Sequence, residues 1–385
     1  MRCERLFLWI TMHLHAKRNA EIETIRAIAI LLVMFRHVHY ALPIGIADYP
    51  TWLQGTWSGV DLFFVISGYV ITGSLLKQDA LRQQGVLTAR GLLASFYIRR
   101  VFRLLPASLL TVALYAACTA WFNASGVFGK LADVGQEAIY ILLYVYNFAV
   151  PHIGSSLLGW HWSLSLEEQF YLVYPMLFLL LKADRRRLLF FAWIVLLVNL
   201  LIRPIYAVYV PAEKYWPLFT TPTFLRMDLL FAGCALALLP VPDWIRRFGS
   251  MNRIGMWASL FLVATVAGWM GFRPLLVYPL ILIGSVYLVG LAAAQQGFVP
   301  TNALLRWIGG RSYALYLMNI PCLYFADEVY FRITGAGIEQ ASGLPALATA
   351  LGAHILMVVV AEILYRWVET PMIEYGRSLR LRPTN

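Results

Sequence analysis

The chain has 385 residues, of which 60% are hydrophobic and only 13% are charged, and its mean hydropathy is +0.68. Soluble domains average about 25% charged residues, so this composition excludes a soluble globular protein and predicts an all-α polytopic membrane protein. The net charge of +11 fits basic cytoplasmic loops better than a nucleic-acid-binding surface, since no nucleic-acid-binding motif accompanies it. The four cysteines show neither metal-ligand spacing nor a disulfide framework.

Apolar runs of membrane-spanning length recur along almost the whole chain. We expect about ten transmembrane helices, at residues 25–42, 60–76, 104–122, 166–182, 188–206, 224–240, 255–272, 274–294, 312–331 and 345–366. They form one transmembrane domain at 25–371, between a cytoplasmic leader at 1–24 and a basic cytoplasmic tail at 372–385.

Loop charge predicts the orientation of these spans, because lysine and arginine concentrate in cytoplasmic loops. The leader, the loop at 77–103 and the turn at 182–187 are all basic. Because the last two of these loops both lie in the cytoplasm, an even number of membrane crossings must separate them. Three apolar segments lie between them, so one of the three is not a full span. The segment at 136–150 is the weakest, being short and carrying two polar residues. We therefore expect a re-entrant or surface helix there, and both termini in the cytoplasm.

The first span carries two ionisable side chains, Arg26 and His37, in one apolar run. Their spacing closes about three helical turns, so both fall on one face, about 16 Å apart along the axis. Ionisable side chains within a membrane are costly and are functional candidates. The orientation places Arg26 near the cytoplasm and His37 in the outer half. The structural alternatives are a snorkelling anchor for Arg26 and a satisfied polar residue for His37.

The second span opens at its outer end with Gly59-Val-Asp61 and continues to Ser67 and Gly68. Asp61 has two interpretations. It is either an N-cap of the helix or a carboxylate level with His37 that orients the imidazole and raises its basicity. The small residues Ser67 and Gly68 predict close packing against a neighbouring helix.

The third span is preceded on the cytoplasmic side by Arg99-Arg100-Val-Phe-Arg103. These arginines are explained equally by the anchoring role of basic residues at the inner membrane edge. However, Arg100 and Arg103 lie three residues apart on one helical face, and paired guanidinium groups suit phosphate recognition. An anionic cytosolic donor such as a coenzyme A thioester would fit there.

A fourth polar segment, His161-Trp-Ser-Leu-Ser-Leu-Glu-Glu, opens a span on the outer side. Ser165 and Glu168 have the spacing of a capping box, which predicts a helix start. Two adjacent carboxylates, Glu167 and Glu168, are more than a cap requires, and a buried glutamate is a candidate general acid or base. We expect these acids to lie with His37 on the outer side, opposite the arginines.

The order and spacing of these segments resemble the acyltransferase-3 family of integral-membrane acyltransferases. The resemblance covers about residues 25–371. The matching segments are Arg26–His37, GVDLFFVISGY at 59–69, RRVFRLLPA at 99–107 and WSLSLEEQFYLVYP at 162–175, with weaker matches in RMDLLFAGCALA at 226–237, GGRSYALYLMN at 309–319 and WVETP at 367–371.

The resemblance implies acyl transfer from cytosolic acyl-CoA, often acetyl-CoA, to an extracytoplasmic hydroxyl of a sugar, polysaccharide or glycolipid. It makes His37 the essential histidine, with Asp61 or Glu168 orienting it or binding the acceptor. It makes Arg26 the motif partner of His37, Arg100 and Arg103 the donor-side arginines, and Ser165 and Glu168 the family's Ser-x-x-Glu element. We also expect Arg26 to bind the donor, and Trp162, Ser165 and Glu167 to have supporting or acceptor-side roles. One departure is Asn319, where the family often has a histidine, so no base is available at that position.

The sequence therefore predicts a bacterial inner-membrane O-acyltransferase that uses acyl-CoA as a substrate and needs no permanently bound cofactor or metal. A proton-coupled transporter or flippase is the alternative, in which the intramembrane acids and histidine form a proton relay. A transporter does not need the paired arginines, and no inverted repeat is detectable. A purely structural scaffold leaves the polar residues unexplained. The acceptor, the acyl length, the oligomeric state and the choice between direct transfer and an acyl-histidine intermediate stay open.

Overall fold

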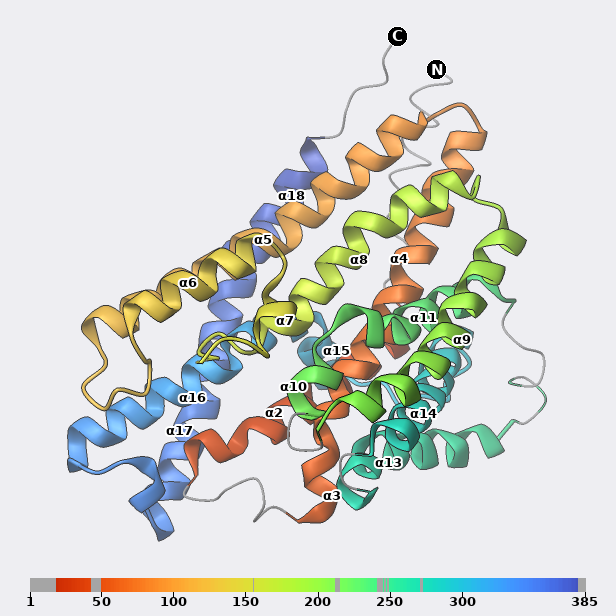
Figure 1. Cartoon of the computed structure of the whole chain (residues 1–385). Helices are drawn as coiled ribbons and strands as arrows, with labels where there is room; N and C mark the ends of the chain where they lie inside the picture. The colour runs from red at the N-terminus through yellow and green to blue at the C-terminus, as the bar shows by residue number, and fades with distance from the viewer. Residues whose placement is uncertain are drawn as a thin grey trace.

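The computed structural model describes residues 19–42, 50–154, 156–211, 215–240, 245, 247, 249–270 and 273–379. Within these ranges every regular element is a helix (Figure 1). Most of the expected leader and the last six residues of the tail lie outside the described part of the chain.

The long helices follow the predicted apolar segments closely. They are α2 (Ala20–His37), α4 (Gly59–Gln83), α5 (Ala89–Trp121), α8 (His161–Leu180), α9 (Arg185–Tyr209), α13 (Met251–Met270), α14 (Pro274–Ala294), α16 (Ser312–Thr334) and α17 (Gly343–Leu364).

Shorter elements connect these helices or extend them. They are α3 (Thr51–Gln54), α6 (Leu131–Leu142), α7 (Tyr146–Ala149), α10 (Tyr215–Thr220), α11 (Met227–Leu238), α15 (Ala303–Gly310) and α18 (Thr370–Ser378), with 3-10 turns η1 (Val38–Ala41), η3 (Gly55–Ser58), η5 (Thr223–Leu225) and η6 (Ile338–Gln340), and a π-helical turn η7 (Tyr365–Glu369).

Six helical segments in the described ranges are long and apolar enough to cross a membrane. They include α4, α5, α9, α13, α14 and the continuous α17–α18 segment. The prediction of a full span at 224–240 is wrong for a single helix, because α11 has 12 residues and rises only about 18 Å. Residues 136–150 likewise form no continuous span: α6 ends at Leu142 and Tyr144 adopts a positive φ of 56° before α7 begins.

The first long helix, α2, runs between α17 and α15 (Figure 1), and ten of its 18 residues are buried. It begins at Ala20 because the Asn19 carboxamide oxygen accepts the N–H groups of Glu21 and Ile22. It then packs against α4, α15 and α16. On one side of the bundle α5 runs alongside α18, and α6 folds back along the C-terminal part of α5 (Figure 1). The candidate residues of α2, α5, α8 and α16 consequently face a common interior.

Helix α4 packs closely against α11, as its small residues predict. A Cβ added at Gly68 would overlap the backbone carbonyl of Leu230, and one added at Gly233 would overlap that of Val65. Each glycine therefore lets the partner backbone approach, which is how small residues bring helices together in membranes. The predicted packing role of Gly68 is confirmed.

We expect Gly68→Ala to destabilise the fold by about 1–3 kcal/mol, because the added methyl group meets rigid backbone rather than a movable side chain. Denaturant unfolding of the detergent-solubilised protein, followed by far-ultraviolet circular dichroism, measures the change. Gly73→Ala is a matched control in the same helix, since its Cβ would meet open space. Equal losses in the two variants would contradict the packing argument.

Candidate active site

Arg26 and His37 both contact α16. The Arg26 Nη2 atom donates to the Ser312 hydroxyl at 3.0 Å, and the Asn319 amide nitrogen donates to His37 Nδ1 at 3.0 Å. Arg26 and His37 follow each other along α2 in the same order as their partners Ser312 and Asn319 along α16. The two helices therefore run in the same direction. The two ionisable side chains therefore share one face of α2, as their spacing predicts.

Polar groups also fill the interval between these two contacts. Ser312, Tyr316 and Asn319 are spaced i, i+4 and i+7 on α16, so they lie along one helical face. The Tyr316 hydroxyl donates to the Trp160 carbonyl at 2.9 Å and lies 2.6 Å from the Ser163 hydroxyl. All three α16 residues are buried. The result is a polar line inside the bundle, which leads from Arg26 to His37.

Glu167 and Glu168 lie in the same region of the bundle as the arginines. This corrects the prediction that the two acids lie on the outer side, opposite the arginines. Glu167 accepts hydrogen bonds from the Ser67 hydroxyl at 2.9 Å and from the Tyr171 hydroxyl at 2.5 Å. The Arg100 guanidinium lies over the Tyr171 ring, 4.8 Å from its centroid. The charges of Arg100 and Arg26 act on Glu167. Glu167 therefore belongs to the arginine end of the polar line and not to the His37 end.

Arg103 completes the arginine cluster. The charges of Arg100 and Arg26 act on its guanidinium, and so does the carboxylate of Glu369. The three guanidinium groups thus lie close enough for their charges to interact, and Arg26 also pairs with Glu23 at 3.4 Å. Such a cluster attracts anions and can bind several phosphate oxygens.

Glu168 and Ser165 lie within α8 and line a narrow crevice. The helix begins at His161 with Trp160 as its N-cap residue, so the capping-box interpretation of Ser165 and Glu168 is wrong. Both line the crevice together with Ser108, His161 and Tyr313. The charge of Arg100 acts on Glu168 as well. Glu168 therefore faces a crevice that α5 and α16 also line.

Asp61 is paired with Arg226 and not with His37. Both side chains are completely buried, and the Arg226 guanidinium forms an ion pair with the Asp61 carboxylate. Asp61 is also not the N-cap of α4, because the helix starts at Gly59 and its N-cap residue is Ser58. The expected orienting contact between Asp61 and His37 is replaced by a buried ion pair.

A second buried ion pair lies beside the first. Arg203 donates to Asp228 at 2.8 Å, and the guanidinium groups of Arg203 and Arg226 lie 4.9 Å and 4.3 Å from the centroid of the Tyr278 ring. These contacts connect α9, α11 and α14, and Asp61 adds α4. Their geometry indicates a structural role.

Trp162 is a packing residue at the start of α8. It is buried and meets Phe64 edge to face, with ring centroids 6.1 Å apart. Sequence reasoning gave Ser67 only a packing role and gave no role to Tyr171 or Tyr316, although Tyr171 follows Glu167 by one helical turn. That i, i+4 spacing was a usable signal for the Glu167–Tyr171 pair.

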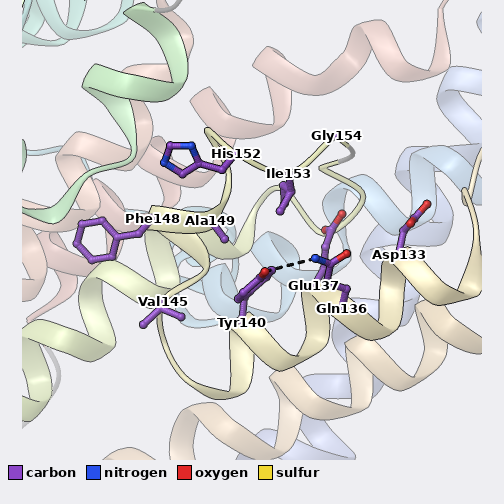
Figure 2. A pocket seen from close by; sticks show the side chains of 10 residues that line it. All are labelled: Asp133, Gln136, Glu137, Tyr140, Val145, Phe148, Ala149, His152, Ile153 and Gly154. Carbon is purple, nitrogen blue, oxygen red and sulfur yellow. Dashed lines mark hydrogen bonds between the residues drawn. The ribbon is translucent and has the colours of Figure 1, made fainter.

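A separate cavity of about 620 Å³ opens between α6 and the segment that contains α7 (Figure 2). Polar side chains of α6 line one part of it, and Phe148 and His152 line the part away from Asp133 (Figure 2). The cavity shares none of its lining residues with the crevice at Glu168.

Comparisons with known proteins identify the family of the chain. A family model for an acyltransferase domain matches residues 19–366. The chain belongs to the acyltransferase-3 family. A putative O-acetyltransferase of Staphylococcus aureus strain COL is 28% identical over 388 residues, which cover 94% of this chain and 59% of that protein. The O-acetyltransferase OatA of S. aureus strain NCTC 8325 is 27% identical over 389 residues, covering 92% and 57% of the two chains.

The chain thus spans about three-fifths of the length of these curated relatives. No solved structure matches it. The resemblance found in the motifs is confirmed over nearly their whole range.

Proposed function

We propose that the protein is a bacterial inner-membrane O-acyltransferase that moves an acyl group, in particular acetyl, from cytosolic acyl-CoA to a hydroxyl of an extracytoplasmic sugar, polysaccharide or glycolipid. The observation that carries the proposal is the polar line from Arg26 along α16 to His37. The names of the O-acetyltransferase relatives support the acetyl group.

The arginine cluster would bind the donor. Arg26, Arg100 and Arg103 can neutralise the phosphates of coenzyme A, which carry the strongest negative charge of the donor. The pantetheine arm would then follow the polar line, and this places the thioester near His37. Glu167, with Ser67 and Tyr171, would keep the arginines apart and oriented.

His37 would act on the acceptor hydroxyl as a general base. In the structure the Asn319 amide nitrogen donates to His37 Nδ1, which leaves the imidazole proton on Nε2. A half-turn of the amide presents its oxygen instead, so Asn319 can hold the imidazole whichever nitrogen carries the proton. With the amide turned in this way, Nδ1–H donates to the Asn319 oxygen and Nε2 has the lone pair that takes the hydroxyl proton. The acceptor oxygen then bonds to the acyl carbon, the carbon–sulfur bond breaks, and the thiolate leaves and takes up a proton. Transfer through an acyl-imidazole gives the same products.

One argument for the alternative function, a proton-coupled transporter, is weakened. A relay would use Asp61, His37 and Glu168 as exchanging groups. Asp61 is instead held by Arg226 in a fully buried ion pair. A carboxylate neutralised in this way is a poor carrier of protons, and the acyltransferase accounts for the arginine cluster as well.

The test of the function is acyl transfer by the purified protein in lipid vesicles, supplied with acetyl-CoA and envelope glycans. We expect coenzyme A release that depends on the glycan, and glycan products heavier by one acyl group in mass spectrometry. Envelope glycans from a strain that lacks the gene should lack that same mass increment. Acetyl-CoA that is neither bound nor consumed would contradict the proposal.

The donor site makes a sharper prediction. Arg100→Lys should raise the KM for acetyl-CoA about tenfold, because lysine provides neither the forked donor pair nor the stacking on Tyr171. Arg99→Lys is the matched control, since Arg99 precedes it in α5 and bonds to Ser95 of the same helix. The rate of coenzyme A release, measured against acetyl-CoA concentration, gives the KM of each variant. Equal KM values for the two variants would remove Arg100 from donor binding.

A further inference from the structure

The cavity between α6 and the α7 segment has the dimensions of a ligand site. Its volume of about 620 Å³ lies within the range of roughly 300–1,000 Å³ typical of small-molecule pockets. Asp133, Gln136 and Tyr140 project into it from one face of α6, at positions i, i+3 and i+7 (Figure 2). Phe148 and His152 belong to the second wall, which the α7 segment forms, and lie at the end away from Asp133 (Figure 2).

The α6 wall of the cavity is fixed by a buried carboxylate. Glu137 is 1% exposed, and it accepts the backbone N–H groups of Leu157 and Leu158 at 3.0 and 2.7 Å and the hydroxyl of Tyr146 at 2.7 Å. These bonds fasten α6 to both ends of the loop that closes the cavity. The cavity is therefore preformed, which reduces the cost of ordering it when a ligand binds.

The second wall is fixed to the helix that carries the acids of the active site. Gln169, which follows Glu168 in α8, donates to the Tyr144 carbonyl at 2.6 Å and to the Asn147 side chain at 2.9 Å. Asn147 in turn donates to Thr221 and Thr223. Occupancy of the cavity thus acts on a segment that is bonded directly to α8.

The side chains of the cavity define the chemistry of its ligand. An amide, a phenol, a carboxylate and an imidazole offer both donors and acceptors, while Phe148 exposes 41% of its surface as a flat apolar face. Among the described residues that line it, two are carboxylates and none is a lysine or arginine. The phosphates of acyl-CoA would be repelled here, and a purely apolar ligand would leave the polar groups unpaired. A ligand ring that carries hydroxyl groups and has an apolar face would bond to the polar side chains and also pack against Phe148.

We propose that this cavity binds a short neutral stretch of the acceptor glycan, with one ring stacked on Phe148 and hydroxyls along the stretch bonded to Tyr140, Gln136 and Asp133. The inference rests on the proposed acyl transfer to a glycan and adds a docking site for that glycan, separate from the arginine cluster. Gln136 already donates to the Tyr140 hydroxyl at 3.3 Å, so the two groups are held in position to share a ligand hydroxyl (Figure 2).

Binding of chitotriose and maltotriose to the full chain in lipid nanodiscs tests the proposal, measured by saturation-transfer NMR. We expect saturation transfer from the unaltered protein to ring protons of at least one trisaccharide. Phe148→Ala and Gln136→Ala should each weaken this binding about tenfold. Phe261→Ala is the control, since Phe261 is equally aromatic and 64% exposed on α13. Its affinity should match that of the unaltered protein.

Two outcomes overturn the docking site: neither trisaccharide binds, or Phe148→Ala binds as tightly as Phe261→Ala. His37→Ala separates this result from the fate of the proposed function, because it should bind sugar normally while losing transfer. If the unaltered protein binds sugar through Phe148 yet transfers no acyl group, the acyltransferase mechanism fails and the sugar site stands.

Discussion

Replacing His37 by alanine is expected to lower the rate of acyl transfer by about 10²–10⁴-fold, the usual contribution of a general base. The KM for acetyl-CoA should stay close to that of the unaltered protein, because the arginine cluster that would bind the donor is retained. Steady-state coenzyme A release at saturating acetyl-CoA, with the acylated product measured by mass spectrometry, gives the rate. A drop in kcat without a change in donor KM is the signature of a group that acts in the transition state.

His39→Ala is the matched control for this loss. His39 lies two residues beyond His37 in the turn η1, and its Nδ1 bonds to the Arg36 carbonyl at 3.0 Å, away from the contact with Asn319. We expect the control to transfer at nearly the unaltered rate. If His37→Ala keeps this rate as well, His37 has no catalytic role, and Glu168 in its crevice becomes the base to test next.

The sequence predicted the helices well because hydropathy is a local property of the chain. Nine of the ten proposed spans lie within or overlap long helices, and the broken segment at 136–150 followed from the parity of the basic loops. Two local signals misled. The capping-box spacing of Ser165 and Glu168 occurs inside α8, and the apolar run at 224–240 contains a helix of only 12 residues. Spacing and hydropathy do not mark where a helix begins.

The site was predictable only where its geometry is set within one helix. The common face of Arg26 and His37 follows from helical periodicity. The partner of His37 lies 282 residues away on α16, and Arg226 is 165 residues from Asp61, so no periodicity connects them. The loop charges gave each helix a direction but not its depth relative to its neighbours. For this reason we predicted Glu167 on the side opposite the arginines. The packing of α5 against α8 instead brings Arg100 over the Tyr171 ring.

Arg226→Leu is expected to destabilise the protein by about 3–5 kcal/mol, because it leaves the Asp61 carboxylate buried without a counter-charge. The double variant Asp61→Leu/Arg226→Leu removes both charges and should recover most of this loss, since apolar replacement of a buried ion pair is often neutral. Denaturant unfolding in detergent, followed by circular dichroism, measures both changes. An Arg226→Leu protein as stable as the original would contradict the ion pair.

The double variant also decides what Asp61 does. The carboxylate has two possible roles, a structural partner of Arg226 and an orienting group for His37, and either single variant disturbs both. In the double variant the fold is restored while the carboxylate is still absent. Transfer at nearly the unaltered rate would then make Asp61 structural, as its complete burial against Arg226 indicates. A folded but inactive double variant would return Asp61 to the catalytic site, because stability would no longer explain the loss.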